Sequence, residues 1–302
     1  MRIRDSVVVV TGASSGIGRA TAMAFAQQGC AVVLAARSEV ALRAAANSCS
    51  GRRGTRTLVV ATDVSDADAV DRLAQRAVER FGRIDAWINA AAVSVYGAFG
   101  DVPMEDFRRV LDVNVMGCVH GARVALRVMR KQGRGTLVNV VSVLGLLTMP
   151  YDHPYVMSKH AVRALSSALR QELWLEGEKR IHVCTVLPAT VDTPLFEHAA
   201  NHTGRRPVAM PPVYRAERVA RAIVNVVRVP RREVPIGATG LLALVGSRLS
   251  PALVERMAAR RTRASHFSPD EPAPATHGNL YQPTPGTGAV DGGWGGRHRD
   301  AR

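Results

Sequence analysis

Lysine and aromatic residues are scarce in this chain. Only three of its 40 basic residues are lysines, and phenylalanine, tryptophan and tyrosine together make up 5% of the sequence. Residues 215–263 hold 11 arginines and three acidic residues, but no aromatic side chain on which a nucleic-acid base could stack. We therefore expect no nucleic-acid partner, and we interpret the net charge of +15 mainly as a general enrichment in arginine.

Long apolar runs and paired cysteines are also missing. No apolar stretch approaches the length of about 18 residues that a membrane-spanning helix needs, and a glycine-rich turn already begins at position 12, so we expect no secretory signal. Cys30, Cys49, Cys118 and Cys184 show no Cys-x-x-Cys spacing. They are predicted to be reduced core thiols of a cytoplasmic protein, with no metal site and no disulfide framework.

Because lysine is scarce, the position of Lys159, four residues after Tyr155, is informative. On a helix, side chains at this spacing lie on the same face. An ammonium group beside a phenol stabilises the phenolate and lowers the pKa of the tyrosine from about 10 toward the range of a useful proton donor. The alternative is a surface pair in which the tyrosine packs on the aliphatic part of the lysine.

A second pattern begins near the N-terminus, where an apolar run leads into Thr11-Gly12-x-x-x-Gly16-x-Gly18. Glycine lets the backbone come close to a pyrophosphate, and the free N–H groups at the start of the following helix favour its negative charge. An ordinary tight turn also uses glycine, but the position after the first strand favours a dinucleotide-binding loop.

Apolar strands and amphipathic helices alternate after this loop. Strands are expected at 31–36, 57–60, 84–88, 136–141 and 181–187, and helices at 40–47, 67–80, 104–130 and from Tyr155 to about Glu176. Continuous apolar strands separated by helices indicate a parallel sheet covered on both faces. The predicted fold is a single doubly wound, Rossmann-like α/β domain at 1–235, with a basic helical extension at 236–263 and a Pro/Gly-rich tail at 264–302.

These patterns together resemble the short-chain dehydrogenase/reductase family. The resemblance covers roughly residues 5 to 230, and it depends on the order and spacing of many short motifs: the Thr11-Gly12 turn, Asp63, Asn89-Ala90-Ala91, Asn114, Ser142, Tyr155-x-x-x-Lys159, and Pro188 with Thr193. It implies an oxidoreductase that transfers a hydride between a nicotinamide and a carbonyl or alcohol carbon, with Tyr155 as general acid or base.

The resemblance also implies roles for residues around that tyrosine. Lys159 would hold the nicotinamide ribose, and Ser142 would hydrogen-bond the substrate oxygen. Asn114 would lie at a local distortion of the long helix, where its backbone carbonyl holds a water that connects Lys159 with solvent. The positions expected to bind the cofactor are Gly12, Ser14, Ser15, Gly16, Ile17, Gly18, Arg37, Asp63, Val64, Asn89, Ala90, Tyr155, Lys159, Pro188, Val191 and Thr193.

The chain departs from the family pattern at three positions. Ala91 and Ala189 replace glycines and add a methyl group where backbone passes close to the cofactor, so we expect a small adjustment of fit. Ile88 replaces an asparagine that would brace neighbouring strands, which bears on stability more than on chemistry.

The end of the second strand favours NADP over NAD. Enzymes that take NAD usually carry an acidic residue there, which accepts the ribose hydroxyls and repels a 2′-phosphate. This chain reads Ala35-Ala36-Arg37-Ser38 and so offers a planar cation suited to phosphate. NADP is expected, with NAD as the alternative.

Substrate and assembly follow from the resemblance as well. The segment after Thr193, which covers the substrate in this family, is rich in apolar residues, so an apolar or amphipathic carbonyl or alcohol substrate is expected. Family members commonly pair the helices at 113–128 and 161–175, which implies a homodimer or homotetramer. The alternative from another class is a nucleotide-binding regulatory protein without turnover, but an intact set of catalytic residues favours the enzyme.

The C-terminal third is the part that the resemblance explains least. An apolar run from Ile236 and a basic helix beginning near Pro251 could lie on an anionic membrane. Without aromatic anchors, packing beside the substrate opening or against a partner subunit is favoured over peripheral membrane contact. The tail holds five prolines and seven glycines, and we expect it to be largely disordered unless Leu280, Tyr281 or Trp294 docks onto the domain.

Overall fold

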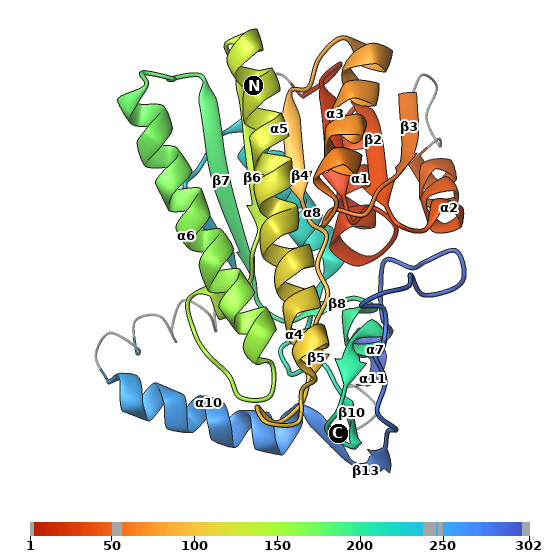
Figure 1. The fold of residues 1–302 in the computed structure, drawn as a ribbon, viewed down its shortest axis with the longest axis vertical. Helices are drawn as coiled ribbons and strands as arrows, with labels where there is room; N and C mark the ends of the chain where they lie inside the picture. The colour runs from red at the N-terminus through yellow and green to blue at the C-terminus, as the bar shows by residue number, and fades with distance from the viewer. Residues whose placement is uncertain (1–2, 50–55, 238–245, 247–249, 298–302) are drawn as a thin grey trace.

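A seven-stranded parallel sheet forms the centre of the molecule (Figure 1). The computed structural model describes residues 3–49, 56–237, 246 and 250–297. In spatial order the strands are β3 (Arg56–Ala61), β2 (Ala31–Ala36), β1 (Val7–Thr11), β4 (Ala86–Asn89), β6 (Gly135–Val140), β7 (Ile181–Pro188) and β12 (Glu233–Ile236). The chain winds outward from β1 in one direction and then in the other, which opens a crevice at the carboxyl ends of β1 and β4. The predicted doubly wound fold is confirmed.

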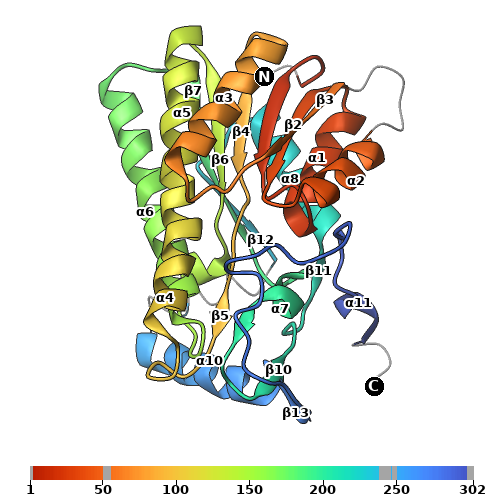
Figure 2. The same cartoon turned by 45° about the vertical axis from the view of Figure 1, so that its right-hand side comes forward.

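Helices cover both faces of this sheet (Figures 1 and 2). One face carries α1 (Gly16–Gln27), α2 (Glu39–Cys49) and α8 (Ala216–Arg228), and the other carries α3 (Ala67–Phe81), α4 (Met104–Leu111), α5 (Gly117–Gln132) and α6 (His153–Leu175). Asp66 caps α3, its carboxylate accepting the N–H groups of Asp68 and Ala69.

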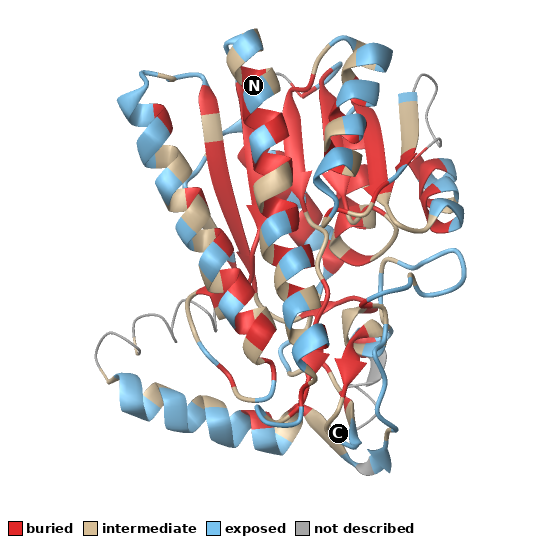
Figure 3. Cartoon of the chain, viewed as in Figure 1, coloured by how far each residue is buried: buried red, intermediate tan, exposed pale blue. Residues whose placement is uncertain are grey.

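Alternate side chains of β1 belong to different cores. Val8 is fully buried in a cluster with Phe25 of α1 and Ile223 of α8, whereas Val9 is buried in a cluster with Leu73 of α3. Successive strand residues point to opposite faces, so a continuous valine run fits a sheet covered on both sides. Figure 3 shows the result as buried strands between helices that are exposed along their outer faces.

The long helix expected at 104–130 is interrupted. Between α4 and α5 the chain forms a π-helical segment, η1 (Asp112–Met116), which contains Asn114. A π-helical turn breaks the regular hydrogen-bond ladder and is often found at functional sites. The local distortion implied at Asn114 is therefore present in the fold.

Two elements of the domain were not predicted. Our sequence assignment ended with the sixth strand, but α8 and the edge strand β12 follow it, and β12 pairs in parallel with β7. The strand is only four residues long and contains Glu233 and Pro235. Proline and charge are depleted in strand interiors but tolerated at a sheet edge, which explains why the apolar pattern missed it.

All four cysteines are buried and unpaired, as predicted for core thiols. Burial raises the pKa of Cys49, Cys118 and Cys184 to about 11. No helix within the described part of the chain is both long and apolar enough to cross a membrane.

Short strands outside the central sheet pair in the described part of the chain, and one of these pairs includes the C-terminal strand β13. The pairs are β5 (Val95–Tyr96) with β9 (Ala200–Asn201), β8 (Val191–Asp192) with β11 (Tyr214–Arg215), and β10 (Arg205–Pro207) with β13 (Phe267–Pro272). The helix α10 (Pro251–Ser265) begins at Pro251 as expected and exposes Leu253 and Met257. Most of the apolar run before it, at 238–245 and 247–249, lies outside the described residues.

The described part of the Pro/Gly-rich tail is packed onto the domain. Residues 277–295, which we call the strap, rise from β13 toward α1 and α2 and end at α11 (Trp294–Arg297), as the dark blue segment in Figures 1 and 2 shows. Leu280 is fully buried and Trp294 is nearly so. The expectation of a largely disordered tail therefore gives way to the docking through Leu280 and Trp294 that we named as its alternative.

Candidate active site

A groove of about 460 Å³ opens at the carboxyl edge of the sheet, beside the crevice between β1 and β4. Most positions predicted to bind the cofactor line it: Gly12, Ser14, Ser15, Gly16, Ile17, Gly18, Arg37, Asp63, Val64, Ala90, Tyr155, Lys159 and Thr193. They come from separate parts of the chain that meet where the parallel strands end.

The glycines of the first turn are required by close backbone contacts. Gly12 has φ +68°, and a Cβ there would lie 2.7 Å from the Ala91 Cα; a Cβ on Gly18 would lie 2.1 Å from the Gly12 carbonyl oxygen. The turn places the N–H groups at the start of the 12-residue helix α1 at the groove. A cradle without side chains at a helix N-terminus fits the pyrophosphate of a dinucleotide.

Asn89, Pro188 and Val191 do not line the groove. The Asn89 amide points into the protein, where its Oδ1 accepts the Trp87 indole N–H at 2.8 Å and its Nδ2 donates to Asn139 Oδ1 at 2.9 Å. Asn89 thus braces β4 against β6, the task that Ile88 cannot perform. Its expected place at the adenosine ribose is not supported, because its side chain lies inside the protein.

Tyr155 and Lys159 line the groove, whereas Ser142 is buried beside Tyr155 and does not line it. Tyr155 lies in the first turns of α6 and shares a side-chain hydrogen bond with Ser142, which follows β6. The Lys159 ammonium lies 5.1 Å from the centre of the Tyr155 ring and donates to the Val140 carbonyl at 3.2 Å. The fold therefore places the predicted hydroxyl, phenol and ammonium together.

The pKa of Tyr155 differs from our expectation. Burial and the nearby Asp152 raise it above the usual value, and the hydrogen bond with Ser142 lowers it only in part. Burial also lowers the pKa of Lys159, whose ammonium is directed at a carbonyl and over the ring. The pKa of Tyr155 is therefore raised in this structure and not lowered as we expected, because desolvation of the phenol is the largest contribution.

Asn114 is buried beside the groove and is hydrogen-bonded to the helix α6. Its Oδ1 accepts the Val93 N–H at 2.9 Å, and its Nδ2 donates to Ser158 Oγ at 3.0 Å. The Ser158 hydroxyl in turn donates to the Tyr155 carbonyl at 2.6 Å. The side chain thus connects the loop after β4 with α6, while the water-holding role of its backbone carbonyl stays a prediction.

Asp152 was not predicted as a site residue. Its carboxyl is fully buried before α6 and accepts the Ser94 hydroxyl at 2.7 Å. Burial raises its pKa well above the usual value, and Lys159 offsets this only in part. Its place on the loop before Tyr155 allowed a role in the substrate pocket, but an ordinary turn role was favoured, because the sequence does not show that this loop is buried.

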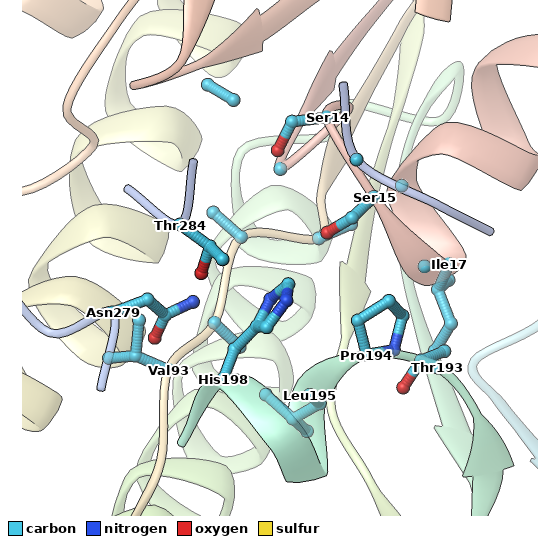
Figure 4. A pocket seen from close by; sticks show the side chains of 18 of the residues that line it. Ser14, Ser15, Ile17, Val93, Thr193, Pro194, Leu195, His198, Asn279 and Thr284 are labelled. Carbon is cyan, nitrogen blue, oxygen red and sulfur yellow. The ribbon is translucent and has the colours of Figure 1, made fainter. Parts of the chain in front are cut away.

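The strap lies across the groove and occupies its polar groups. The Gly16 N–H donates to the Ala289 carbonyl at 2.8 Å, and Arg37 donates to the carbonyls of Asn279 at 2.5 Å and Leu280 at 2.9 Å. In Figure 4, Asn279 and Thr284 lie on the strap side of the pocket, opposite Ser14 and Ser15. The same N–H and guanidinium groups that suit a dinucleotide phosphate therefore also hold the strap.

Further contacts anchor the strap near its beginning and at its end. Arg109 forms an ion pair with Asp63 at 2.6 Å and donates to the Leu280 carbonyl at 2.9 Å. At the other end, the Asp192 carboxylate accepts the backbone N–H groups of Gly292, Trp294 and Gly295 at 2.9–3.0 Å. Neither Arg109 nor Asp192 was predicted, because their partners lie far away in the sequence.

Comparisons with known proteins identify the family. The family model for short chain dehydrogenases matches residues 6–204. The chain belongs to the short-chain dehydrogenase/reductase family. It is 36% identical over 259 residues to the uncharacterized oxidoreductase YxnA of Bacillus subtilis, with 85% of this chain and 72% of YxnA covered.

Solved structures of the family support the same assignment. A short-chain dehydrogenase/reductase from Burkholderia phymatum in complex with NAD is 28% identical, with a TM-score of 0.76 and with 84% of this chain and 97% of that chain covered. An alcohol dehydrogenase from Thermococcus sibiricus, complexed with 5-hydroxy-NADP, is 26% identical, with a TM-score of 0.66 and with 77% and 95% covered. The protein is thus an oxidoreductase of this family, acting on CH–OH or C=O groups of a small molecule.

Proposed function

We propose that the enzyme uses NADP(H) and that Tyr155 exchanges the proton during interconversion of a carbonyl and an alcohol. The observation that supports this most is that Tyr155, hydrogen-bonded to Ser142, and Lys159 line the same groove as the glycine turn. A bound nicotinamide would supply or accept the hydride. The chain's own contribution is a buried phenol, hydrogen-bonded to a hydroxyl that can orient the substrate oxygen.

Tyr155 is the proposed proton donor in carbonyl reduction. Burial raises the pKa of its phenol, which is therefore protonated at neutral pH, so the proton for a developing alkoxide is present. Oxidation of an alcohol would first require that the phenol lose its proton to a base. Lys159, whose pKa burial lowers, lies beside the ring and is suited to stabilise the phenolate that forms.

The preference for NADP rests on Arg37. The two residues directly after β2 are Arg37 and Ser38, neither of which is acidic, and Arg37 lines the groove. The related structures include one complex with NAD and one with 5-hydroxy-NADP, so the family alone does not choose. A 2′-phosphate would accept hydrogen bonds from Arg37 beside the two strap carbonyls that Arg37 contacts in this structure, or in their place. A charged acceptor forms a stronger hydrogen bond than a carbonyl does.

The substrate is proposed to be apolar or amphipathic. Leu195 of the helix α7 (Leu195–His198) lines the groove, and His198 at the end of the same helix points into it (Figure 4). Burial lowers the pKa of His198, which favours its neutral form near neutral pH. His198 therefore adds no charge to the surface of the groove near neutral pH, which is compatible with an apolar or amphipathic substrate.

A homodimer or homotetramer is proposed as the working assembly. The helices α5 and α6 lie side by side on one face of the sheet (Figure 1), and α6 ends in Trp174 and Leu175, which are 80% and 77% exposed. Exposed large apolar residues at a helix end favour an interface. Light scattering should show a dimer or tetramer at micromolar concentration, and a monomer there would contradict the proposal.

The variant Tyr155→Phe tests the proposed chemistry. It should keep NADPH binding and lose roughly two to four decades of turnover, the usual range for a positioned acid or base. Activity would be followed as NADPH oxidation with ketones, aldehydes, quinones, steroids and 3-oxoacyl thioesters. Tyr151→Phe is the matched control, because Tyr151 lies on the preceding loop and does not line the groove.

Equal turnover in Tyr155→Phe and the parent enzyme would remove Tyr155 from the mechanism. NADPH binding without oxidation by any of these substrate classes would favour the alternative of a binding protein without turnover.

A further inference from the structure

A cluster of potential metal ligands lies outside the cofactor groove, where the strap crosses α4. Among the described residues, one ligand atom from each of Asp106, His202 and His277 lies within 4.8 Å of the other two. Asp106 lies in the first turn of α4, His202 follows β9, and His277 begins the strap. The sequence predicted no metal site, because we considered cysteine spacing and these residues are distant in the chain.

Asp106 is the centre of this cluster. Its side chain is fully buried, and its ion-pair partners in the described structure are the two histidines rather than an arginine or lysine. His202 Nε2 lies 2.9 Å from Oδ2, and His277 Nδ1 lies 2.9 Å from Oδ1. Two imidazoles and one carboxylate form a ligand set that suits zinc and leaves a further position for solvent.

The backbone already holds both histidines in position. Their neighbours Asn201 and Thr276 form an antiparallel bridge, with N–H to carbonyl distances of 2.8 Å and 3.0 Å in the two directions. The His202 N–H also donates to the Tyr96 carbonyl at 2.7 Å. Ligands on a fixed backbone lose little conformational entropy when an ion binds, which is a property of a preorganised site.

Metal binding at this cluster needs only a rearrangement of protons. Each neutral imidazole would move its proton from the nitrogen that faces Asp106 to its other ring nitrogen and present a lone pair. No bond to carbon changes, and no oxidant or reductant is involved. The Tyr281 hydroxyl, 3.0 Å from Asp106 Oδ1, would remain as a donor that orients the carboxylate.

We propose that Asp106, His202 and His277 bind one divalent transition ion of the zinc type, and that this ion fastens the strap to α4. The strap supplies His277 and the body of the domain supplies the other two ligands. Arg109, one turn after Asp106, already holds the Leu280 carbonyl, so an ion at the cluster would strengthen an existing attachment. The competing explanation is a hydrogen-bonded cluster that binds no metal.

Titration of the full-length, tag-free protein with metal decides between these explanations. After treatment with a chelator, Zn²⁺ would be followed by calorimetry and Co²⁺ by its visible absorption. We expect one ion per chain, and at least tenfold weaker binding in each of His202→Gln and His277→Gln. His182→Gln, in β7, is the control and should bind as the parent does. Absence of saturable binding to the parent protein would overturn the site. Binding to both ligand variants that is as tight as binding to the parent would also overturn it.

Hydrogen exchange tests the fastening separately. Saturating Zn²⁺ should slow amide exchange across residues 277–292 in the parent protein but not in His277→Gln. Unchanged exchange in the parent would overturn the fastening of the strap. Both experiments are done without cofactor or substrate, so their outcome does not depend on the proposed hydride transfer.

Discussion

The glycine turn at 12–18 and the strap at 277–295 meet at the same groove but are positioned by different means. The turn takes its shape from local contacts, such as the approach of Gly18 to the Gly12 carbonyl. The strap has almost no secondary structure of its own, and its carbonyls bond to Gly16, Arg19 and Arg37, which lie more than 240 residues earlier. A turn can thus be identified from its own sequence, whereas a strap depends on side chains elsewhere in the chain.

This comparison also bears on stability. A composition rich in proline and glycine lowers the apolar area that a segment can bury, which is why the tail was expected to be disordered. The strap compensates with the buried Leu280 and Trp294 and with charged partners, above all Asp192 and three arginines. Hydrogen bonds to charged groups contribute about 1.5–3 kcal/mol each, more than neutral ones.

The largest effect is expected from Gly12→Ala. Its Cβ would overlap the Ala91 backbone, so overpacking adds roughly 1–3 kcal/mol to the cost of about 1 kcal/mol for a non-glycine residue at positive φ. Gly133→Ala is the matched control, because it has the same φ of +68° but nothing within 4 Å of the new Cβ. Urea unfolding and NADPH binding would be measured; equal losses in both variants would show that the turn tolerates the methyl group.

A comparable loss of stability is expected at acid pH, where the buried His266 of the C-terminal region gains a proton. Burial lowers the pKa of His266 from 6.5 to about 4. Between these pH values, His266 therefore binds a proton in the unfolded state but not in the folded state. The stability from the neutral imidazole is complete above pH 6.5 and is lost as the pH falls to about 4, at most on the order of 3 kcal/mol. Urea unfolding across this range should show a smaller pH dependence in His266→Asn, whose amide can still donate to the Val208 carbonyl. The same pH dependence in the variant would contradict this assignment.

A smaller effect, confined to binding, is expected from Arg37→Asp. It should weaken NADPH binding by about 1.5–3 kcal/mol, because a charge-assisted contact becomes a repulsion, and should spare or improve NADH. Arg19→Gln is the control, since it removes donors to the Thr287 and Gly288 carbonyls of the strap without touching the proposed phosphate position. Equal loss of affinity for both cofactors in Arg37→Asp would mean that Arg37 only supports the strap.

The sequence by itself determined six of the seven strands of the sheet, most of its helices, and the glycine turn, Tyr155 and Lys159 of the groove. Apolar runs such as Val7–Val10 and the glycines of the first turn act through local sterics and side-chain period, which a linear pattern displays. The spacing of Tyr155 and Lys159 likewise needs only one helix to bring the side chains together.

The tertiary structure decided what depends on distant partners. Burial raised the pKa of Tyr155 against our prediction, and it turned Asn89 from an expected cofactor contact into a brace between strands. In the cluster, Asp106 contacts histidines 96 and 171 residues away, and Arg37 contacts strap carbonyls more than 240 residues away. Desolvation and long-range hydrogen bonds are properties of the packed chain, and no short window of sequence contains both of the groups that make them.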